Sequence, residues 1–146
     1  METIIRSATP EDYEAIAVLN QEEMGYEYPP ERQKEKLERL LADGRNCILV
    51  AQQGESIVGY VHLVDYDVLY APPMKNIMGI AVSSACRHTG LGKMLLEAAE
   101  AWAKETGAEA VRLNSGETRK DAHRFYRALG YRGEKMQLNL KKTLEE

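Results

Sequence analysis

The stretch SACRHTGLGKMLLEAAEAW, residues 84–102, places Gly90 and Gly92 directly before an amphipathic helical pattern. Behind the glycines, apolar residues recur at the spacing of one helical face: Leu91, Met94, Leu95, Ala98 and Trp102. Glycine loses more conformational freedom on folding than any other residue, so two glycines at a helix start need a physical reason. Their missing Cβ atoms leave the backbone open to close approach by a ligand.

That ligand is expected to be an anion. The beginning of a helix carries unpaired N–H groups and a partial positive charge, which together favour a phosphate. Arg87 and Lys93 add cationic side chains before and after the glycines. In the alternative interpretation the glycines only shape a tight connection and Arg87 is a solvated surface charge. The R-x-x-G-x-G spacing alone does not decide between the two.

Two common phosphate loops do not fit this turn. A Walker A loop requires G-x-x-x-x-G-K-[ST], but Arg87 lies five residues before Gly92, and Met94 follows Lys93. A dinucleotide fingerprint requires three glycines after the first strand of its unit, whereas here the third glycine is missing and the turn comes late in the chain. A different kind of phosphate ligand is therefore expected.

Composition limits the class of protein. The chain has 146 residues, 44% of them apolar and 29% charged, which suits one folded domain over residues 1–146. Its formal net charge of −4 disfavours nucleic acid or an anionic membrane as the main partner. No apolar run approaches a membrane span, and the start METIIRSATPEDYEAI does not resemble a secretory signal. We therefore expect a cytoplasmic protein.

Cysteine usage gives no sign of a disulfide framework or a metal centre. The chain has two cysteines, Cys47 and Cys86, and no metal-ligand spacing surrounds them. We expect both to be reduced and no metal to be bound.

The periodicity of the chain predicts an α/β protein with a mixed sheet covered by helices. Strand patterns occur over six segments, 3–8, 46–53, 56–68, 75–83, 109–115 and 133–142. Helical patterns occur over four segments, about 10–24, 31–41, 90–105 and 119–129. The predicted order is β-α-α-β-β-β-α-β-α-β.

Two segments together resemble the signatures of the GNAT family of N-acetyltransferases. IAVSSACRHTGLGKMLLEAAEAWAKETGAEAVRLN, residues 80–114, is similar to that family's acetyl-coenzyme A motif: a strand, R-x-x-G-x-G, a long helix and a further strand. DAHRFYRALGY, residues 121–131, is similar to its second signature, an alanine followed four residues later by a tyrosine and then a Gly-aromatic pair. The resemblance covers nearly the whole chain and implies a GNAT-like fold with a splayed pair of parallel strands, here 76–82 and 110–114.

The resemblance also implies acetyl-coenzyme A as cofactor and a set of residues that bind it. Backbone groups of Ile80, Ala81 and Val82 would pair with the pantetheine arm. Backbone amides of the following turn would hold the pyrophosphate, from Arg87, His88, Thr89, Gly90, Leu91, Gly92 and Lys93. Many relatives carry an asparagine where this chain has Arg119, so Arg119 is left out of the set.

Acetyl transfer to an amine needs a base for the amine proton and an acid for the departing thiolate. The resemblance places Tyr126 beside the cofactor sulfur, which makes its phenol the predicted acid. A core aromatic in the stripe with Ala122, Phe125 and Leu129 is the alternative role for Tyr126. No glutamate lies on the strand 75–82, so the base stays unassigned among six candidates: Glu22, Glu23, His62, Asp65, Tyr66 and Asp67.

The acceptor pocket is expected to border the segment 20–33, if the family arrangement holds. Glu22, Glu23 and Glu27 would favour a cationic amine, although a solvated acidic helix end explains the same acids. Tyr26 and Tyr28 could line an apolar part. A small amine, a peptide N-terminus and a lysine side chain are all compatible with this pattern.

The sequence therefore predicts an N-acetyltransferase that uses acetyl-coenzyme A. Two alternatives are a non-catalytic module that senses coenzyme A and a structural or interaction subunit. The alternating residues 136–140 could pair two chains into a homodimer, or their edge could be covered within one chain.

Overall fold

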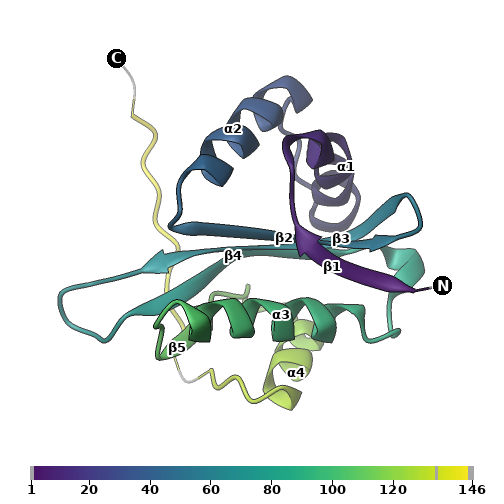
Figure 1. Cartoon of the computed structure of the whole chain (residues 1–146). Coiled ribbons are helices and arrows are strands. Elements are labelled where there is room, and N and C mark those ends of the chain that lie inside the picture. Colours follow the sequence, from purple (N-terminus) through teal and green to yellow (C-terminus); the bar gives the residue numbers. More distant parts are fainter. Residues whose placement is uncertain (1, 134, 145–146) are drawn as a thin grey trace. The chain divides into compact units, whose positions relative to one another are not determined.

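The computed structural model describes residues 2–133 and 135–144. The chain forms two compact units, Met1–Leu113 and Asn114–Glu146, and each is considered by itself. The first unit holds the sheet and the first three α-helices, and the second holds the last helix (Figure 1). Both units fall within the single domain predicted over 1–146, and that assignment stays a prediction.

The first unit is built on one five-stranded sheet with strand order β1-β2-β3-β4-β5. The strands are β1 (Thr3–Ser7), β2 (Asn46–Gln53), β3 (Ser56–Tyr66), β4 (Met74–Val82) and β5 (Ala110–Leu113). The neighbours from β1 to β4 are antiparallel, and β5 runs parallel to β4. The mixed sheet predicted from the sequence is confirmed.

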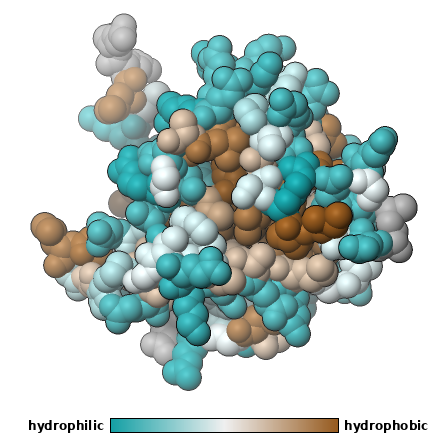
Figure 2. All heavy atoms as spheres, viewed as in Figure 1, coloured by the Kyte–Doolittle hydropathy of each residue, from teal (hydrophilic) through white to brown (hydrophobic). Residues whose placement is uncertain are grey.

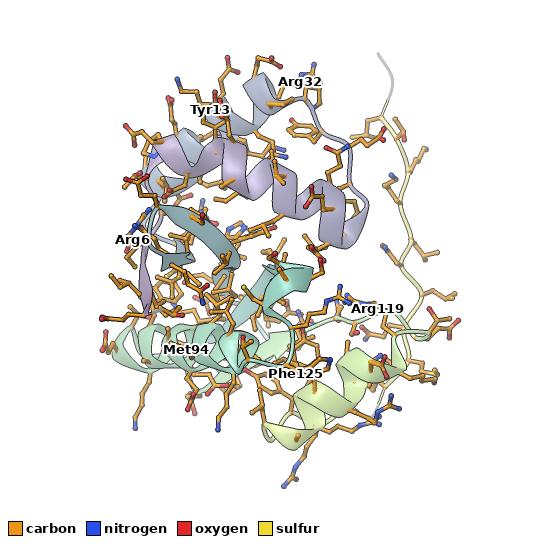
Figure 3. The ribbon with its side chains drawn as sticks, turned by 90° about the vertical axis from the view of Figure 1, so that its right-hand side faces the viewer. Arg6, Tyr13, Arg32, Met94, Arg119 and Phe125 are labelled. Atoms are coloured by element: carbon orange, nitrogen blue, oxygen red, sulfur yellow. The ribbon has the colours of Figure 1, made fainter. Side chains whose placement is uncertain are left out.

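Helices cover both faces of this sheet. A 3-10 turn η1 (Pro10–Asp12) leads into α1 (Tyr13–Met24) and then α2 (Pro30–Ala42) on one face, while α3 (Leu91–Glu105) lies on the other (Figure 1). Figure 3 shows Tyr13 in the first helical layer and Met94 on α3 across the sheet. The apolar stripe predicted for 90–105 is only partly right, because Leu91 and Leu95 are buried but Met94 is exposed. The face that α3 buries consists of Leu91, Leu95, Leu96, Ala99 and Ala103.

One glycine in β3 sets how closely α3 approaches the sheet. A Cβ on Gly59 would lie 3.1 Å from Leu95 Cδ1 and 3.1 Å from the Ala81 carbonyl oxygen. Such contacts are tighter than packed atoms allow without movement. The bare backbone at Gly59 therefore lets Leu91 and Leu95 of α3 lie directly on the sheet at β3.

The two parallel strands separate where β4 carries a bulge. Pairing with β5 runs from Met74 to Ile77 of β4, which lies opposite Leu113. The register against β3 shifts between His62 and Leu63, so Met78 is the extra residue on β4. Beyond it, β4 continues to Val82 without a strand of the described residues on its β5 side. The splayed strand pair is confirmed within the first unit.

The predicted order is confirmed as far as the last helix, α4 (Lys120–Ala128), but the last predicted strand is absent from the described residues. Of the segment 133–142, residue 134 lies outside the described part, and the others form no strand. Met136, Leu138 and Leu140 are at least 76% exposed. Alternating apolar residues give a segment one apolar face, but they do not provide a neighbouring strand for hydrogen bonding. A strand in a sheet needs both. The homodimer based on this segment stays a prediction.

Candidate active site

Ile80, Ala81 and Val82, the residues expected to bind the pantetheine arm, lie on the part of β4 beyond the bulge. Their inner edge is paired with β3, with Ala81 opposite Tyr60. Their outer edge has no strand partner among the described residues. Backbone N–H and C=O groups on such an edge are available to an extended ligand, as they would be to another strand.

The glycine-containing turn follows directly from this edge. A 3-10 turn η2 (Ser84–Cys86) ends β4, and α3 begins at Leu91. The Ser83 N–H donates to the Val58 carbonyl at 2.8 Å, and Thr89 Oγ1 donates to the Cys86 carbonyl at 2.5 Å. These bonds fix the loop between the strand and the helix.

The backbone conformation at position 90 also favours glycine. Its φ is +86°, in the left-handed region that side chains disfavour. His88, two residues earlier, has φ +63° although it carries a side chain. A non-glycine residue in this region stores strain, and such strain concentrates at functional loops.

All ten predicted cofactor residues come together at the end of β4 and the start of α3. Leu91 is only 2% exposed and its side chain belongs to the core, so it offers a ligand only its backbone. Lys93 is exposed on the first turn of α3. Local sequence proximity, a strand followed by a tight turn and a helix, is enough to assemble this part of the site.

Glu23 has a structural role that the sequence did not indicate. Its carboxylate, on the last turn of α1, accepts hydrogen bonds from the Ser84 N–H at 3.0 Å and from Arg87 Nη2 at 3.1 Å. The Glu23 side chain is 8% exposed, whereas that of Arg87 is 60% exposed. The partners are 61 and 64 residues apart in sequence, so no local pattern could have shown the contact. Glu23 therefore anchors the glycine-containing turn to α1.

A cavity of about 250 Å³ lies in the first unit between α1, α2 and the sheet. On the face shown in Figure 2, apolar side chains gather where these helices meet the sheet. The cavity lining is mainly aromatic and aliphatic, with a few polar groups: Tyr13, Ile16, Asn20, Tyr26, Tyr28, Gln33, Lys36, Leu37, Leu40, Ile48, Tyr60 and His62. Tyr26 and Tyr28 thus line this cavity, and its identity as the acceptor pocket stays a prediction.

The acids near the end of α1 do not line this cavity. Glu22 faces a separate open hollow with Glu11, Glu14 and Glu55. Glu23 is engaged with the turn before α3. The expectation that these acids would favour a cationic acceptor is therefore not supported by their positions. Among the described residues, Lys36 is the only one with a charged side chain that lines the cavity.

Two hydrogen-bonded pairs mark the floor of the cavity. The Tyr60 hydroxyl donates to Asn20 Oδ1, and burial raises the pKa of Tyr60 to about 12, so the phenol stays protonated. A Cβ on Gly79 of β4 would lie 3.3 Å from the Tyr60 hydroxyl. His62 Nε2 lies 2.8 Å from Asn46 Oδ1. The cavity therefore reaches β4 next to the bulge.

Tyr126 belongs to the second unit, on α4. Its ring makes edge contacts with Phe125 and Tyr131, with centroid distances of 5.3 and 5.8 Å. Burial raises the pKa of the Tyr126 phenol above its ordinary value, and the positive charge of Arg119 opposes this. These contacts suit a packed aromatic that remains protonated, and its role as an acid stays a prediction.

In residues 2–133 and 135–144, His, Cys, Asp and Glu side chains nowhere gather in a group of three that could hold a metal ion. Among the same residues, no helix has both the length and the apolarity needed to cross a membrane.

Comparison with known proteins identifies the family. The model of the acetyltransferase (GNAT) family matches residues 13–131, which include the cavity, the splayed strand and the glycine-containing turn. The chain therefore belongs to the GNAT family of acetyltransferases. Acetyl-coenzyme A is the acetyl donor of this family.

Individual relatives cover the chain to different extents. An aminoalkylphosphonate N-acetyltransferase of Salmonella typhimurium is 29% identical over 129 residues, which are 88% of this chain and 84% of that protein. An uncharacterized N-acetyltransferase of Bacillus subtilis is 50% identical over 50 residues, and this match spans only about a third of either chain (34% and 35%). A protein of Bacillus halodurans described as a transcriptional regulator has a similar structure, with a TM-score of 0.87 at 27% identity over 97% of this chain and 100% of that one.

Proposed function

We propose that this chain transfers the acetyl group of acetyl-coenzyme A to the amine of a small molecule. The observation that carries the proposal is the separation of β4 from β5 beyond Ile77, directly before a glycine-containing turn at the start of α3. An open strand edge followed by a helix N-terminus suits a ligand with an extended amide arm and a diphosphate. Family membership and the aminoalkylphosphonate N-acetyltransferase relative support the same activity.

The proposed cofactor contacts are those that the family resemblance implies. The backbone of Ile80–Val82 pairs with the amide arm, and the amides of 87–93 bind the pyrophosphate. Arg87 contributes a charge-assisted bond, for which its guanidinium turns from Glu23 toward the phosphate. Bound acetyl-coenzyme A supplies an activated thioester carbonyl for attack by an amine.

The acceptor is proposed to bind in the cavity between α1, α2 and the sheet. At about 250 Å³ the cavity is smaller than the roughly 300–1,000 Å³ of sites for drug-sized ligands, so a small amine fits better than a large one. Tyr26 and Tyr28 offer apolar surface, and Lys36 could pair with an acidic group on the same molecule. Peptide N-termini and lysine side chains remain in the test as competing acceptors.

Tyr126 is proposed as the general acid that protonates the departing thiolate. Its phenol is protonated at neutral pH, and a phenol with a pKa of about 10 or above can still donate to a thiolate whose conjugate acid has a pKa of about 8.5. Burial in the second unit keeps that proton in place by raising the pKa further.

The proposal is tested in two measurements on the full chain. Calorimetric titration with acetyl-coenzyme A, supported by native mass spectrometry, should show binding, and a structural subunit would show none. Release of free coenzyme A thiol is then followed with a panel of small amines, amino acids, aminophosphonates and peptides. Binding without amine-dependent thiol release would favour a coenzyme A sensor and contradict transferase activity.

A further inference from the structure

We propose that His62 on β3 is the general base that takes the proton from the acceptor amine, and that Asn46 on β2 positions its ring. This inference rests on the proposed transferase activity and adds the base that the sequence left unassigned.

His62 lies where the acceptor cavity and the splayed strand meet. Its half-buried side chain lines the cavity, and its backbone is paired with Gly79 of β4, one residue beyond the bulge at Met78. Gly79 in turn precedes Ile80, the first residue proposed to contact the cofactor arm. A Cβ on Gly79 would lie 3.3 Å from the Tyr60 hydroxyl, so the bare backbone of Gly79 makes room for this hydroxyl beside β4. An amine in this cavity therefore lies beside the imidazole and close to β4, the strand proposed to bind the cofactor arm.

The hydrogen bond to Asn46 determines which ring nitrogen can act. The amide oxygen of Asn46 only accepts, so at 2.8 Å it receives the proton of His62 Nε2. In the neutral ring the lone pair is then on Nδ1, which becomes the acceptor for a substrate proton. Asn46 lies diagonally across the β2–β3 ladder from His62, with Ile48 directly opposite. The contact depends on strand register and fixes both tautomer and orientation.

The protonation state of His62 suits a base. Burial lowers its pKa below the ordinary histidine value, so the ring is neutral at neutral pH. The titratable groups that line the cavity with it are Lys36 from α2 and four tyrosines: Tyr13, Tyr26, Tyr28 and Tyr60. No carboxylate of the described residues lines this cavity to hold the imidazolium charge. Because no carboxylate among the described lining residues stabilises the imidazolium ion, a protonated His62 ring readily gives its proton to solvent.

The other candidate bases are engaged elsewhere or lie outside the cavity. Asp65 accepts from Lys75 Nζ at 2.5 Å, and Lys75 also lies 4.4 Å from the ring centroid of Trp102 on α3. The Tyr66 ring lies 4.2 Å from the Arg112 guanidinium. Glu23 holds the turn before α3, Glu22 lines the separate hollow, and Asp67 follows the end of β3.

The proton and electron pair balance in this step. The amine nitrogen gives a proton to His62 Nδ1, and its lone pair attacks the thioester carbonyl carbon. A C–N bond forms and the C–S bond breaks. The thiolate takes a proton from Tyr126, which regains one from water, and His62 returns to the neutral form by releasing its proton to water.

The test is His62→Gln, which can keep a hydrogen bond to Asn46 but cannot take up a proton. We expect kcat with the best amine of the panel to fall by about 10²-fold or more. Affinity for acetyl-coenzyme A, measured by calorimetry, should stay near that of the wild type. In the wild type, kcat/KM should decline as pH falls through a pKa below about 6.5, and His62→Gln should lose this decline.

Two further variants separate catalysis from structure. Asn46→Ala should lower kcat about tenfold, which is the effect expected from the loss of one hydrogen bond. Its kcat/KM should still decline as pH falls, but at a different pH from the wild type. His123→Gln is the matched control, because the His123 ring bonds a backbone carbonyl of Gly116 in the second unit. Its pH profile should follow the wild type.

The outcomes distinguish the two proposals. A wild-type protein that releases no thiol with any amine overturns the transferase and the base together. An active wild type whose His62→Gln variant keeps full kcat and the same acidic decline overturns the base alone. If kcat of His62→Gln falls but its kcat/KM still declines at the same acidic pH as in the wild type, His62 is not the base. Its role would then be in packing.

Discussion

The proposed cofactor edge and the proposed acceptor cavity of this protein are assembled in opposite ways. The proposed cofactor edge consists of residues 80–93, a continuous segment in which a strand, a turn and a helix start follow one another. The cavity takes its lining from α1, α2, β2 and β3, spread over residues 13–62. The first is therefore visible as a motif and the second is not. Function at the first should depend on backbone shape, and at the second on individual side chains.

The largest expected effect tests the backbone at the cofactor edge. Gly92→Val should weaken acetyl-coenzyme A binding by more than about 100-fold, because a branched side chain on the first turn of α3 keeps the diphosphate from several N–H groups. The fold should persist, since valine is no worse than glycine within a helix. Calorimetric titration and thermal unfolding measure the two properties.

Gly44→Val provides a matched control for this experiment. No heavy atom lies within 4 Å of the position a Cβ would take on Gly44, and it lies far from the turn in sequence. Its affinity should equal that of the wild type. Wild-type affinity in Gly92→Val as well would mean that the diphosphate does not approach this helix end.

The next effect concerns Tyr126, which lies in the second unit and belongs to neither region. Tyr126→Phe keeps the ring and its contacts with Phe125 and Tyr131 but removes the proton donor. If the phenol is the acid, kcat should fall by about 10²-fold with little change in cofactor affinity. Wild-type kcat, measured where chemistry limits turnover, would show that Tyr126 is only a packed aromatic.

A moderate effect is expected from Arg87, whose side chain extends from the glycine-containing turn before α3. Arg87→Ala should weaken acetyl-coenzyme A binding by about 1–3 kcal/mol, because one charge-assisted hydrogen bond is lost while the backbone amides remain. The acceptor KM should not change. The loss should shrink at high salt, since screening weakens the contribution of an exposed charge. A loss that does not depend on salt would contradict a charge contact.

The smallest effect tests the connection between the regions. Glu23→Ala should weaken acetyl-coenzyme A binding by about 1 kcal/mol, because the turn loses its hydrogen bonds to α1. Since α1 also lines the acceptor cavity, the acceptor KM should rise with it. Steady-state kinetics with both substrates varied measures the two constants. A change in the cofactor constant alone would show that the two regions are independent.

The fold could be predicted well because its signals are local. Strand alternation, helical spacing and the glycines placed every element through α4 within a few residues. The last strand over 133–142 was predicted from Met136, Leu138 and Leu140, which alternate but remain exposed. Periodicity states which face of a segment is apolar, and it says nothing about whether a neighbouring strand is present to pair with it.

The candidate site could be predicted only in its continuous half. Gly90 was identified, although its left-handed φ adds a reason that the spacing alone did not give. Glu22, Glu23 and His62 were equivalent candidates for the base in the sequence. Their side chains go to a separate hollow, to the turn before α3 and to the cavity, respectively. Their positions depend on packing between distant segments.

The sequence by itself determined the order of the elements through α4, the glycine-containing turn and the acetyltransferase family, because each is encoded in neighbouring residues. Tertiary structure decided what depends on distant pairs. The β4 bulge at Met78 is defined against β3, the Glu23 anchor joins α1 to the turn, and the His62 ring lies against Asn46 on the adjacent strand. A polar side chain that is only 8% exposed, such as Glu23, needs hydrogen-bond partners, and only folding brings them to it. The physical reason is that backbone conformation responds mainly to local residues, whereas burial, hydrogen-bond partners and pKa are properties of the packed environment.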